Sequence, residues 1–190
     1  MKFSVIYADP PWSFKTWSKK GMDRSPDYPV LNGNDIYALD IDSIANDNSV
    51  LFIWATSPML KQALTTIGAW GFEYKTIAFT WIKTCKLQPD KLFTGLGYYT
   101  RANSEYCLLA TRGKPLTRLD RGVHSVVMTP IGEHSEKPID VFWRIDRLFG
   151  QLPSIELFSR KPITQFNWTH IGNEITGNDI RVDIERISKL

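Results

Sequence analysis

This chain has few cysteines and no spacing typical of metal ligands. Its 190 residues include two cysteines, Cys85 and Cys107, which lie 22 residues apart and belong to no Cys-x-x-Cys motif. Such usage excludes a disulfide-stapled miniprotein and offers no zinc-binding pattern. We therefore expect two reduced thiols, no metal site and a cytoplasmic protein.

Long apolar runs are also missing. The first run, residues 3–8, stops at Asp9-Pro10-Pro11 and is too short for the h-region of a signal peptide. No uncharged apolar stretch approaches the roughly 20 residues that span a bilayer. We expect no signal peptide and no membrane partner. Since internal repeats, low-complexity tracts and linkers are absent too, residues 1–190 are expected to form one domain.

Neither sign of charge dominates. The 23 Lys and Arg residues against 20 Asp and Glu residues give a net charge of +3, too mild by itself to require a nucleic-acid partner. The distribution is uneven, because residues 13–24 and residues 98–121 each carry +3 and the remainder carries −3. These two segments are either solvated loops or phosphate-binding loops.

The hydrophobic fraction of 43% is that of an ordinary globular protein. Segments with the character of buried strands are residues 3–8, 49–55, 72–83, 104–111, 123–128 and 154–159. Residues 13–35 and 85–100 have the composition of long loops, which are usually functional or mobile.

Three helices are expected between and after these strands. One follows Ser57-Pro58, with Ser57 as N-cap, and ends at Gly68 or Gly71. A second starts at Pro138, and a third is capped by Asn178. Their apolar stripes are Ile139, Phe142, Ile145 and Phe149 in the second and Ile180, Ile184 and Ile187 in the third. Strands alternating with helices predict an α/β fold, with a mostly parallel sheet covered by helices on both faces.

The first strand ends in a segment that can carry chemistry, Asp9-Pro10-Pro11-Trp12. In open α/β sheets, ligands bind beyond the carboxyl ends of the strands. Asp9 offers a carboxylate, and the two prolines fix the direction of the Pro10 carbonyl. Two rigid acceptors match the two N–H donors of a planar amino group, and Trp12 offers a face on which a ring can stack. The alternative is a Pro-Pro turn with Asp9 as a local cap and Trp12 as a core anchor.

Such an arrangement suits methylation of an exocyclic amine. Adenine's amino nitrogen is a poor nucleophile because its lone pair is delocalised into the ring. Accepting both N–H bonds favours a pyramidal nitrogen, and the acceptors stabilise the positive charge that develops during methyl transfer. The base must be flipped out of a duplex or already single-stranded to reach the site.

Four segments of the chain occur in the order found in a known family. They are residues 8–12; Tyr28-Pro29 with a helix at 35–39; Gly95-x-Gly97-Tyr98 with 103–105; and a C-terminal set at 134–138, 155–160 and 168–174. On these motifs the chain resembles the N6-adenine methyltransferases, the family of the catalytic subunit of the eukaryotic messenger-RNA adenosine methyltransferase. It looks most like the bacterial and phage DNA-modifying members. The resemblance implies a Rossmann-like, S-adenosylmethionine-dependent fold with a circularly permuted motif order.

The resemblance also implies roles for individual residues. The catalytic motif would be Asp9, Pro10, Pro11 and Trp12, with Asp9 near the cofactor's amino group as well. Lys137 would pair with the methionyl carboxylate, and Arg160 would reach the ribose. The other residues implied at the cofactor are Phe158, Asn173 and Glu174.

At the substrate, Trp12 and Tyr28 would hold the flipped base. Glu105 would either contact the substrate or order its own loop. Phosphates would be gripped by two basic loops, 13–33 and 85–101, through Lys19, Lys20 and Arg101.

The sequence thus predicts a methyltransferase acting on the N6 amine of adenine in DNA. Rival interpretations are the same chemistry on RNA, a non-catalytic nucleic-acid-binding partner subunit, and methylation of an amide or a cytosine amine. The intact Asp9 argues against the last two. A homo-oligomer or a partner subunit remains open at this stage.

Overall fold

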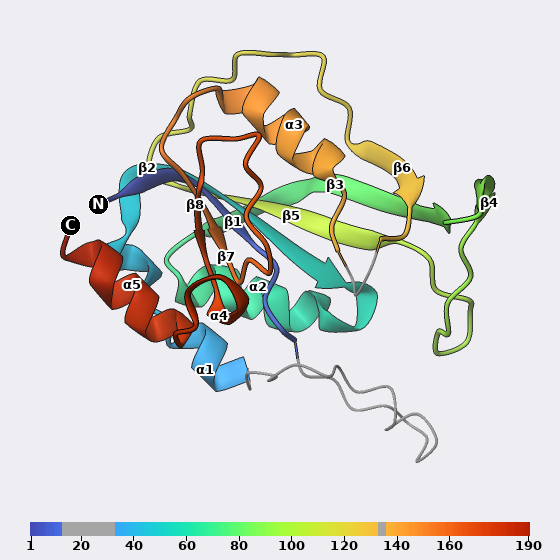
Figure 1. The fold of residues 1–190 in the computed structure, drawn as a ribbon, viewed down its shortest axis with the longest axis horizontal. Helices are drawn as coiled ribbons and strands as arrows, with labels where there is room; N and C mark the ends of the chain where they lie inside the picture. Colours follow the sequence, from blue (N-terminus) through green and yellow to red (C-terminus); the bar gives the residue numbers. More distant parts are fainter. Residues whose placement is uncertain (13–32, 133–135) are drawn as a thin grey trace.

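The computed structural model describes residues 1–12, 33–132 and 136–190 (Figure 1). These residues build one eight-stranded sheet in the order β4-β3-β5-β2-β1-β7-β8, with β6 paired to β3. The strands are β1 Phe3–Ala8, β2 Ala45–Thr56, β3 Glu73–Cys85, β4 Gln88–Leu92, β5 Glu105–Arg112, β6 Val126–Pro130, β7 Ser154–Leu157 and β8 Thr169–Ile171.

Most of these strands run in one direction. Strands β1, β2, β7 and β8 pair in parallel, and β6 pairs in parallel with β3. Strand β5 is antiparallel to both β2 and β3, and β4 is antiparallel to β3. Six of the described strands therefore share one direction, which confirms the mostly parallel sheet predicted from the sequence.

Helices cover both faces of the sheet (Figure 1). The helical elements are α1 Gly33–Tyr37, η2 Ile41–Ser43, η3 Ser57–Met59, α2 Leu60–Ala69, α3 Ile139–Phe149, α4 Asn173–Thr176 and α5 Ile180–Ser188. Helix α3 lies on one face, whereas α1, α2 and α5 lie on the other. Strand β1 serves both faces, because Ile6 and Ala8 pack into the core under α1, α2 and α5, while Val5 and Tyr7 pack under α3.

Two short strands escaped the sequence analysis. The predicted loop at 85–100 contains β4, which forms a hairpin with β3. All five residues of β4 are exposed, so no alternation of apolar and polar residues marks it. Strand β8 spans three residues, too few for any periodicity.

Helix starts also differ from the prediction in two places. Thr56 is the N-cap of a 3-10 turn that precedes α2, and Ser57 lies inside that turn. Asp179, rather than Asn178, caps α5 through its side chain, which accepts from the backbone N–H of Arg181. Trp70 ends α2 before Gly71, whose φ of 78° is a conformation that glycine adopts without strain.

The apolar stripe of α3 is rotated from the predicted one. Phe142 and Ile145 are buried as expected, and Pro138 is the N-cap of the helix. Val141 is also buried, whereas Ile139 is 41% exposed. Ile180, Ile184 and Ile187 of α5 are all buried, as predicted.

Candidate active site

The sheet places the ends of several strands at one edge. Strand β1 lies between β2 and β7. Strands β2 to β6 therefore lie on one side of β1, and the later strands β7 and β8 lie on the other side. Such a reversal of strand order is where open α/β sheets bind ligands. Asp9 follows β1, Phe158 follows β7 and Gly172 follows β8, so the first and the last motifs of the sequence meet at this edge. This meeting fits the permuted motif order implied by the resemblance.

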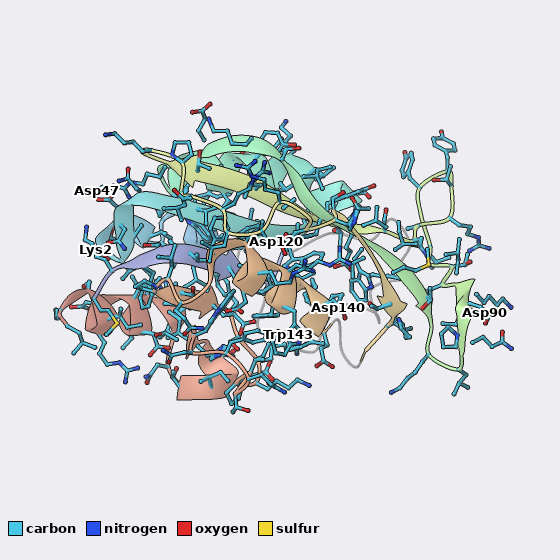
Figure 2. All side chains as sticks on the ribbon, turned by 90° about the horizontal axis from the view of Figure 1, so that it is seen from above. Lys2, Asp47, Asp90, Asp120, Asp140 and Trp143 are labelled. Carbon is cyan, nitrogen blue, oxygen red and sulfur yellow. The ribbon has the colours of Figure 1, made fainter. Side chains whose placement is uncertain are left out.

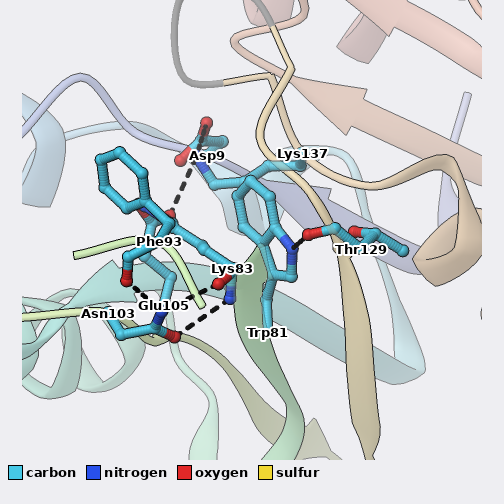
Figure 3. Close-up of polar contacts among 8 residues, drawn as sticks. All are labelled: Asp9, Trp81, Lys83, Phe93, Asn103, Glu105, Thr129 and Lys137. Atoms are coloured by element: carbon cyan, nitrogen blue, oxygen red, sulfur yellow. Dashed lines mark hydrogen bonds and ion pairs between the residues drawn. The ribbon is translucent and has the colours of Figure 1, made fainter. Parts of the chain in front are cut away.

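Four charged side chains form a continuous row beside this edge (Figure 3). Nζ of Lys137 lies 2.6 Å from Oδ2 of Asp9 and 3.4 Å from Oε2 of Glu105. The other carboxylate oxygen of Glu105 accepts from Nζ of Lys83. The row joins β3, β5, the segment before α3 and the end of β1, and its two lysines balance its two carboxylates.

Burial varies along this row. The side chains of Glu105 and Lys137 are 7% and 8% exposed, whereas that of Asp9 is 32% exposed. Asp9 is therefore the member of the row that remains open to a ligand. Glu105 is enclosed and already bonded to two lysines, so the structure favours the second sequence-based interpretation, in which Glu105 orders its surroundings rather than contacting substrate.

The pKa values of the row follow from burial and from neighbours. Desolvation raises the pKa of Asp9 above its ordinary value, and Lys137 opposes this only in part. Burial acts in the same direction on Glu105, but Lys137 and Lys83 outweigh it and hold its pKa below the usual range. For Lys137, burial is outweighed by Asp9 and Glu105, which raise its pKa. Lys137 thus stays charged, and Asp9 is a stronger proton acceptor than an ordinary aspartate.

The Pro10 carbonyl takes part in a hydrogen bond within the segment that follows β1. Its oxygen accepts the backbone N–H of Trp12 at 2.8 Å, which closes a tight turn directly after β1. The carbonyl oxygen has a second lone pair, which this hydrogen bond does not use.

Trp12 differs from the sequence prediction of a ring-stacking face. Its side chain lies in the core, and the residue is 7% exposed. Its Nε1 donates to the backbone carbonyl of Trp54 at 2.9 Å, and Nε1 of Trp54 donates to the hydroxyl of Tyr7 at 2.6 Å. Because the indole is enclosed and bonded, Trp12 acts as the core anchor that fixes the turn after β1.

The loops after β7 and β8 are pressed together. A Cβ on Gly172 would lie 2.4 Å from the carbonyl oxygen of Ser159, so only glycine fits there. Phe158 has a φ of 62°, rare for a residue with a side chain and common at functional sites. Beyond these residues, Nε of Arg160 lies 2.8 Å from Oε1 of Glu174. Asn173 begins the short helix α4 beside this ion pair.

The predicted substrate residues are placed unevenly. Lys19, Lys20 and Tyr28 lie outside the described residues. Arg101 is exposed on the segment before β5, at the same end of that strand as Glu105.

The basic segment 98–121 does not form one surface. Strand β5 divides it, and Arg112 at the other end pairs with Asp42 at 2.5 Å. The backbone N–H of Lys114 donates to Asn48, at the end of the molecule where Figure 2 labels Asp47, away from Asp90. Of Arg101, Arg112 and Lys114, Arg101 is the one at the end of β5 that carries Glu105.

Two pairs of polar residues in this region were given no role by the sequence analysis. Lys83 completes the charged row, and Asn103 holds it in place by bonding the backbone N–H and carbonyl of Lys83 at 3.0 and 2.8 Å. A second pair lies on the same face of the sheet, where Nδ1 of His170 is 2.7 Å from Oε2 of Glu156. Asn103 belongs to a motif quoted above, which could have pointed to its role; Lys83 and Glu156 carried no comparable signal.

Other features of the described residues lie apart from this site. A groove of about 520 Å³, lined mainly by apolar side chains of β2, β3, β5 and α3, lies toward the opposite end of β5. No described helix is both long and apolar enough to cross a membrane. In the described part of the chain, no three His, Cys, Asp or Glu side chains are grouped so that they could hold a metal ion.

A mostly parallel sheet covered on both faces, with acidic and basic groups at its topological switch point, is a Rossmann-like α/β fold with a candidate ligand site. The chain belongs to the MT-A70 family, whose model matches residues 3–174. This membership confirms the resemblance predicted from the sequence motifs.

Individual relatives agree with the family. The chain is 35% identical over 199 residues to the Type II methyltransferase M.MunI of a Mycoplasma species, covering 95% of this chain and 81% of that protein. It is 29% identical over 189 residues to the Drosophila melanogaster N(6)-adenosine-methyltransferase MT-A70-like protein, and 28% identical over 177 residues to the human N(6)-adenosine-methyltransferase catalytic subunit METTL3. These two matches include 99% and 93% of this chain, but only 29% of each eukaryotic protein.

Proposed function

We propose that this methyltransferase transfers a methyl group from S-adenosylmethionine to the N6 amine of adenine in DNA. The observation that carries the proposal is the pairing of a partly exposed Asp9 with a buried Lys137, directly beside the fixed carbonyl of Pro10. Together they offer a charge pair for the cofactor and two acceptors for an amine.

The side chains at the strand ends suit the cofactor. Its methionyl end carries an ammonium and a carboxylate, and the Asp9–Lys137 pair offers the complementary charges. Arg160, Glu174, Asn173 and Phe158, which gather at the ends of β7 and β8, would hold the adenosine part. When bound, the cofactor supplies an electrophilic methyl group on a sulfonium.

The protein's part in the reaction is to hold the amine. Asp9 and the Pro10 carbonyl accept its two N–H bonds, which localises the nitrogen lone pair and stabilises the positive charge that develops there. The raised pKa of Asp9 strengthens this acceptor. Lys137 and Glu105 keep the carboxylate in position, and Trp12 anchors the turn that carries the carbonyl.

Two comparisons favour DNA over RNA. The match to the bacterial relative M.MunI has 35% identity and covers 81% of that protein, whereas the matches to the eukaryotic N(6)-adenosine-methyltransferases have 29% and 28% identity and cover 29% of each protein. A non-catalytic partner subunit is disfavoured by the complete row from Lys83 to Asp9.

The setting of the enzyme is part of the proposal. We infer a single methyltransferase domain, because all described strands join one sheet. The two free cysteines and the bacterial relative favour the cytoplasm of a bacterium, or of one hosting a phage that encodes the protein.

Phosphate binding by Lys19, Lys20 and Arg101 is tested by the salt dependence of DNA affinity. Replacing all three with alanine should make the log–log slope shallower by about two to three units, near 0.9 for each lost contact. The matched control replaces Lys114 and Arg121, which are exposed in the segment that follows β5. An unaltered slope in the triple variant would place the nucleic-acid face elsewhere.

The function itself is tested by incubating the protein with tritiated S-adenosylmethionine and matched DNA and RNA oligomers, followed by chromatography of the nucleosides. The expected product is labelled N6-methyl-2′-deoxyadenosine. Label found only in the RNA, or only in cytosine, would overturn the proposed substrate.

A further inference from the structure

The segment between β4 and β5 exposes a pair of tyrosines. Tyr98 and Tyr99 are 72% and 94% exposed, although aromatic rings usually gain stability by burial. Their ring centroids lie 4.9 Å apart at an interplanar angle of 85°. Figure 1 shows this segment and the β3–β4 hairpin extending away from the body of the molecule, beyond the ends of β3 and β5.

Hydrogen bonds and close backbone contacts hold the backbone of this segment in place. The N–H of Gly95 donates to the carbonyl of Ala102 at 2.7 Å, which bridges the two sides of the loop. A Cβ on Gly97 would lie 1.9 Å from the carbonyl oxygen of Thr100, so the turn that carries the tyrosines requires glycine. Nδ2 of Asn103 donates to the carbonyls of Phe93 and Lys83, which ties the base of the loop to β3. A loop built in this way presents its rings with little loss of entropy on binding.

The charge around the tyrosines favours an anionic partner. Lys86, Lys91 and Arg101 are exposed on the same hairpin and loop, against one acidic residue, Asp90. In Figure 2, Asp90 of β4 lies at the opposite end of the molecule from Lys2 and Asp47. Exposed aromatic rings among basic side chains are the composition of surfaces that bind single-stranded nucleic acid.

The loop is also physically linked to the charged row. Asn103 holds Lys83, which bonds Glu105, which in turn lies 3.4 Å from Lys137. Six residues separate Tyr99 from Glu105, so the chain limits their separation to about 20 Å. At about 3.4 Å of helix axis per nucleotide, a separation of about 20 Å corresponds to about six nucleotides, which sets the scale of the distance from the tyrosines to the charged row.

We propose that Tyr98 and Tyr99 form a stacking site for an unpaired nucleobase a few nucleotides from the adenine held at Asp9. This inference rests on the proposed function and adds the part of the substrate that binds outside the catalytic pocket. Extruding an adenine breaks its stacking with its neighbours. A ring that stacks on a neighbouring base replaces part of that contact without reading the sequence.

The test compares Tyr98→Ala/Tyr99→Ala with Tyr98→Phe/Tyr99→Phe, which keeps both rings. Leu87→Ala, on a residue 94% exposed in the same hairpin, is a control for loss of a non-aromatic side chain. Affinity is measured by fluorescence anisotropy with a 20-nucleotide single strand that has one adenine among thymines. We expect the alanine pair to bind about 10-fold more weakly, and the phenylalanine pair and Leu87→Ala to bind within 2-fold of the wild type.

A second series uses the same strand with one abasic site at each of the six positions on either side of the adenine. The wild type should lose affinity at one or two of these positions, whereas the alanine pair should lose none there, because its stacking site is already absent. Equal binding by the alanine pair and the wild type would overturn the proposal, and so would a phenylalanine pair as weak as the alanine pair.

Sedimentation of each variant tests whether the tyrosines contact a second copy of the chain instead of a nucleobase. A smaller assembly for the alanine pair would show that the tyrosines contact a second copy of the chain, which would overturn the proposal. If the wild type binds and methylates nucleic acid and the alanine pair does so equally well, the stacking site fails and the proposed function stands. If the wild type neither binds nor methylates any strand, both fail.

Discussion

Nζ of Lys137 lies 2.6 Å from Oδ2 of Asp9, although 128 residues separate the two along the chain. This contact joins the motif at the start of the chain to the segment that precedes α3. It holds the Asp9 carboxylate in one direction, and the neighbouring carboxylates raise the pKa of Lys137, which keeps the lysine charged. Glu105, on the other side of Lys137, stabilises the lysine without occupying the open side of Asp9.

Removing Lys137 should weaken cofactor binding. We expect Lys137→Ala to lose about 1.5–3 kcal/mol of S-adenosylmethionine affinity, the scale of a charge-assisted hydrogen bond, as measured by calorimetric titration of the folded protein. The control is Lys189→Ala, whose lysine is exposed and pairs with Glu185 on α5. Unchanged affinity in Lys137→Ala would remove this residue from the cofactor site.

The pH dependence of methyl transfer should report Asp9. The carboxylate exists above its pKa, so activity falls as the pH drops through that pKa, and desolvation places this acidic limb above the ordinary range of aspartate. Lys137 lowers the Asp9 pKa, and its removal should move the limb to higher pH.

This shift is measured in profiles of kcat at saturating cofactor for the wild type, Lys137→Ala and Lys189→Ala. Only Lys137→Ala should displace the limb. A limb that moves to lower pH, or that stays in place, would contradict the coupling between the two side chains.

Trp12 is expected to matter through stability. Trp12→Ala should cost about 3–5 kcal/mol of unfolding free energy, because a large side chain leaves the core. Trp12→Phe should cost less and should lose mainly the hydrogen bond to the Trp54 carbonyl, about 1 kcal/mol. Urea unfolding measures both costs. A folded Trp12→Ala variant whose KM for oligonucleotide rises sharply, while Trp12→Phe keeps the KM of the wild type, would instead support the stacking role predicted from the sequence.

The elements that sequence analysis recovered are those with long apolar patterns. Strands β1, β2, β3 and β5 and the stripe of α5 are buried along most or part of their length, and burial leaves periodicity in the sequence. Strand β4 is exposed at every residue and includes Pro89, so it leaves no such pattern. The cap of α5 could not be chosen from the sequence, because Asn178 and Asp179 are both good capping residues and geometry decides between them.

The sequence could point to a candidate site residue where the chemistry and position of a single residue are enough to mark it. Asp9 stands out at a strand end before two prolines, and Lys137 precedes a helix. Their direct contact, and the completion of the row by Lys83, depend on strand pairing between β3 and β5, which no local pattern records. The burial of Trp12 was one of two interpretations of the same tetrapeptide, and only packing distinguishes them.

Asp179 should stabilise α5 in a pH-dependent way. Hydrogen bonds from the side chain and backbone N–H of Arg181 lower the pKa of Asp179 from its ordinary 3.8 to about 2. A lowered pKa contributes stability that is complete above about 4 and is lost as the pH falls toward 2.

We therefore expect Asp179→Ala to lose about 1 kcal/mol of unfolding free energy at pH 7, and less at pH 2.5. Asp179→Asn keeps a capping oxygen, so it should lose little unfolding free energy at pH 7. Because asparagine does not ionise, the contribution of this cap should not change between the two pH values. Urea titrations at the two pH values measure these differences. Equal losses for Asp179→Ala at both would show that the ionised cap does not contribute.

The most direct test of the role of Asp9 is the rate of methyl transfer from tritiated S-adenosylmethionine to a DNA oligomer. This rate is measured in a single turnover for Asp9→Ala and for the wild type, and the product nucleoside is identified. The wild type should form N6-methyl-2′-deoxyadenosine. Asp9→Ala, with its fold checked by urea unfolding, should be slower by at least about 100-fold, because the amine loses its charged acceptor. A folded Asp9→Ala variant that methylates adenine at a rate near that of the wild type would show that the Asp9 carboxylate is not needed for methyl transfer.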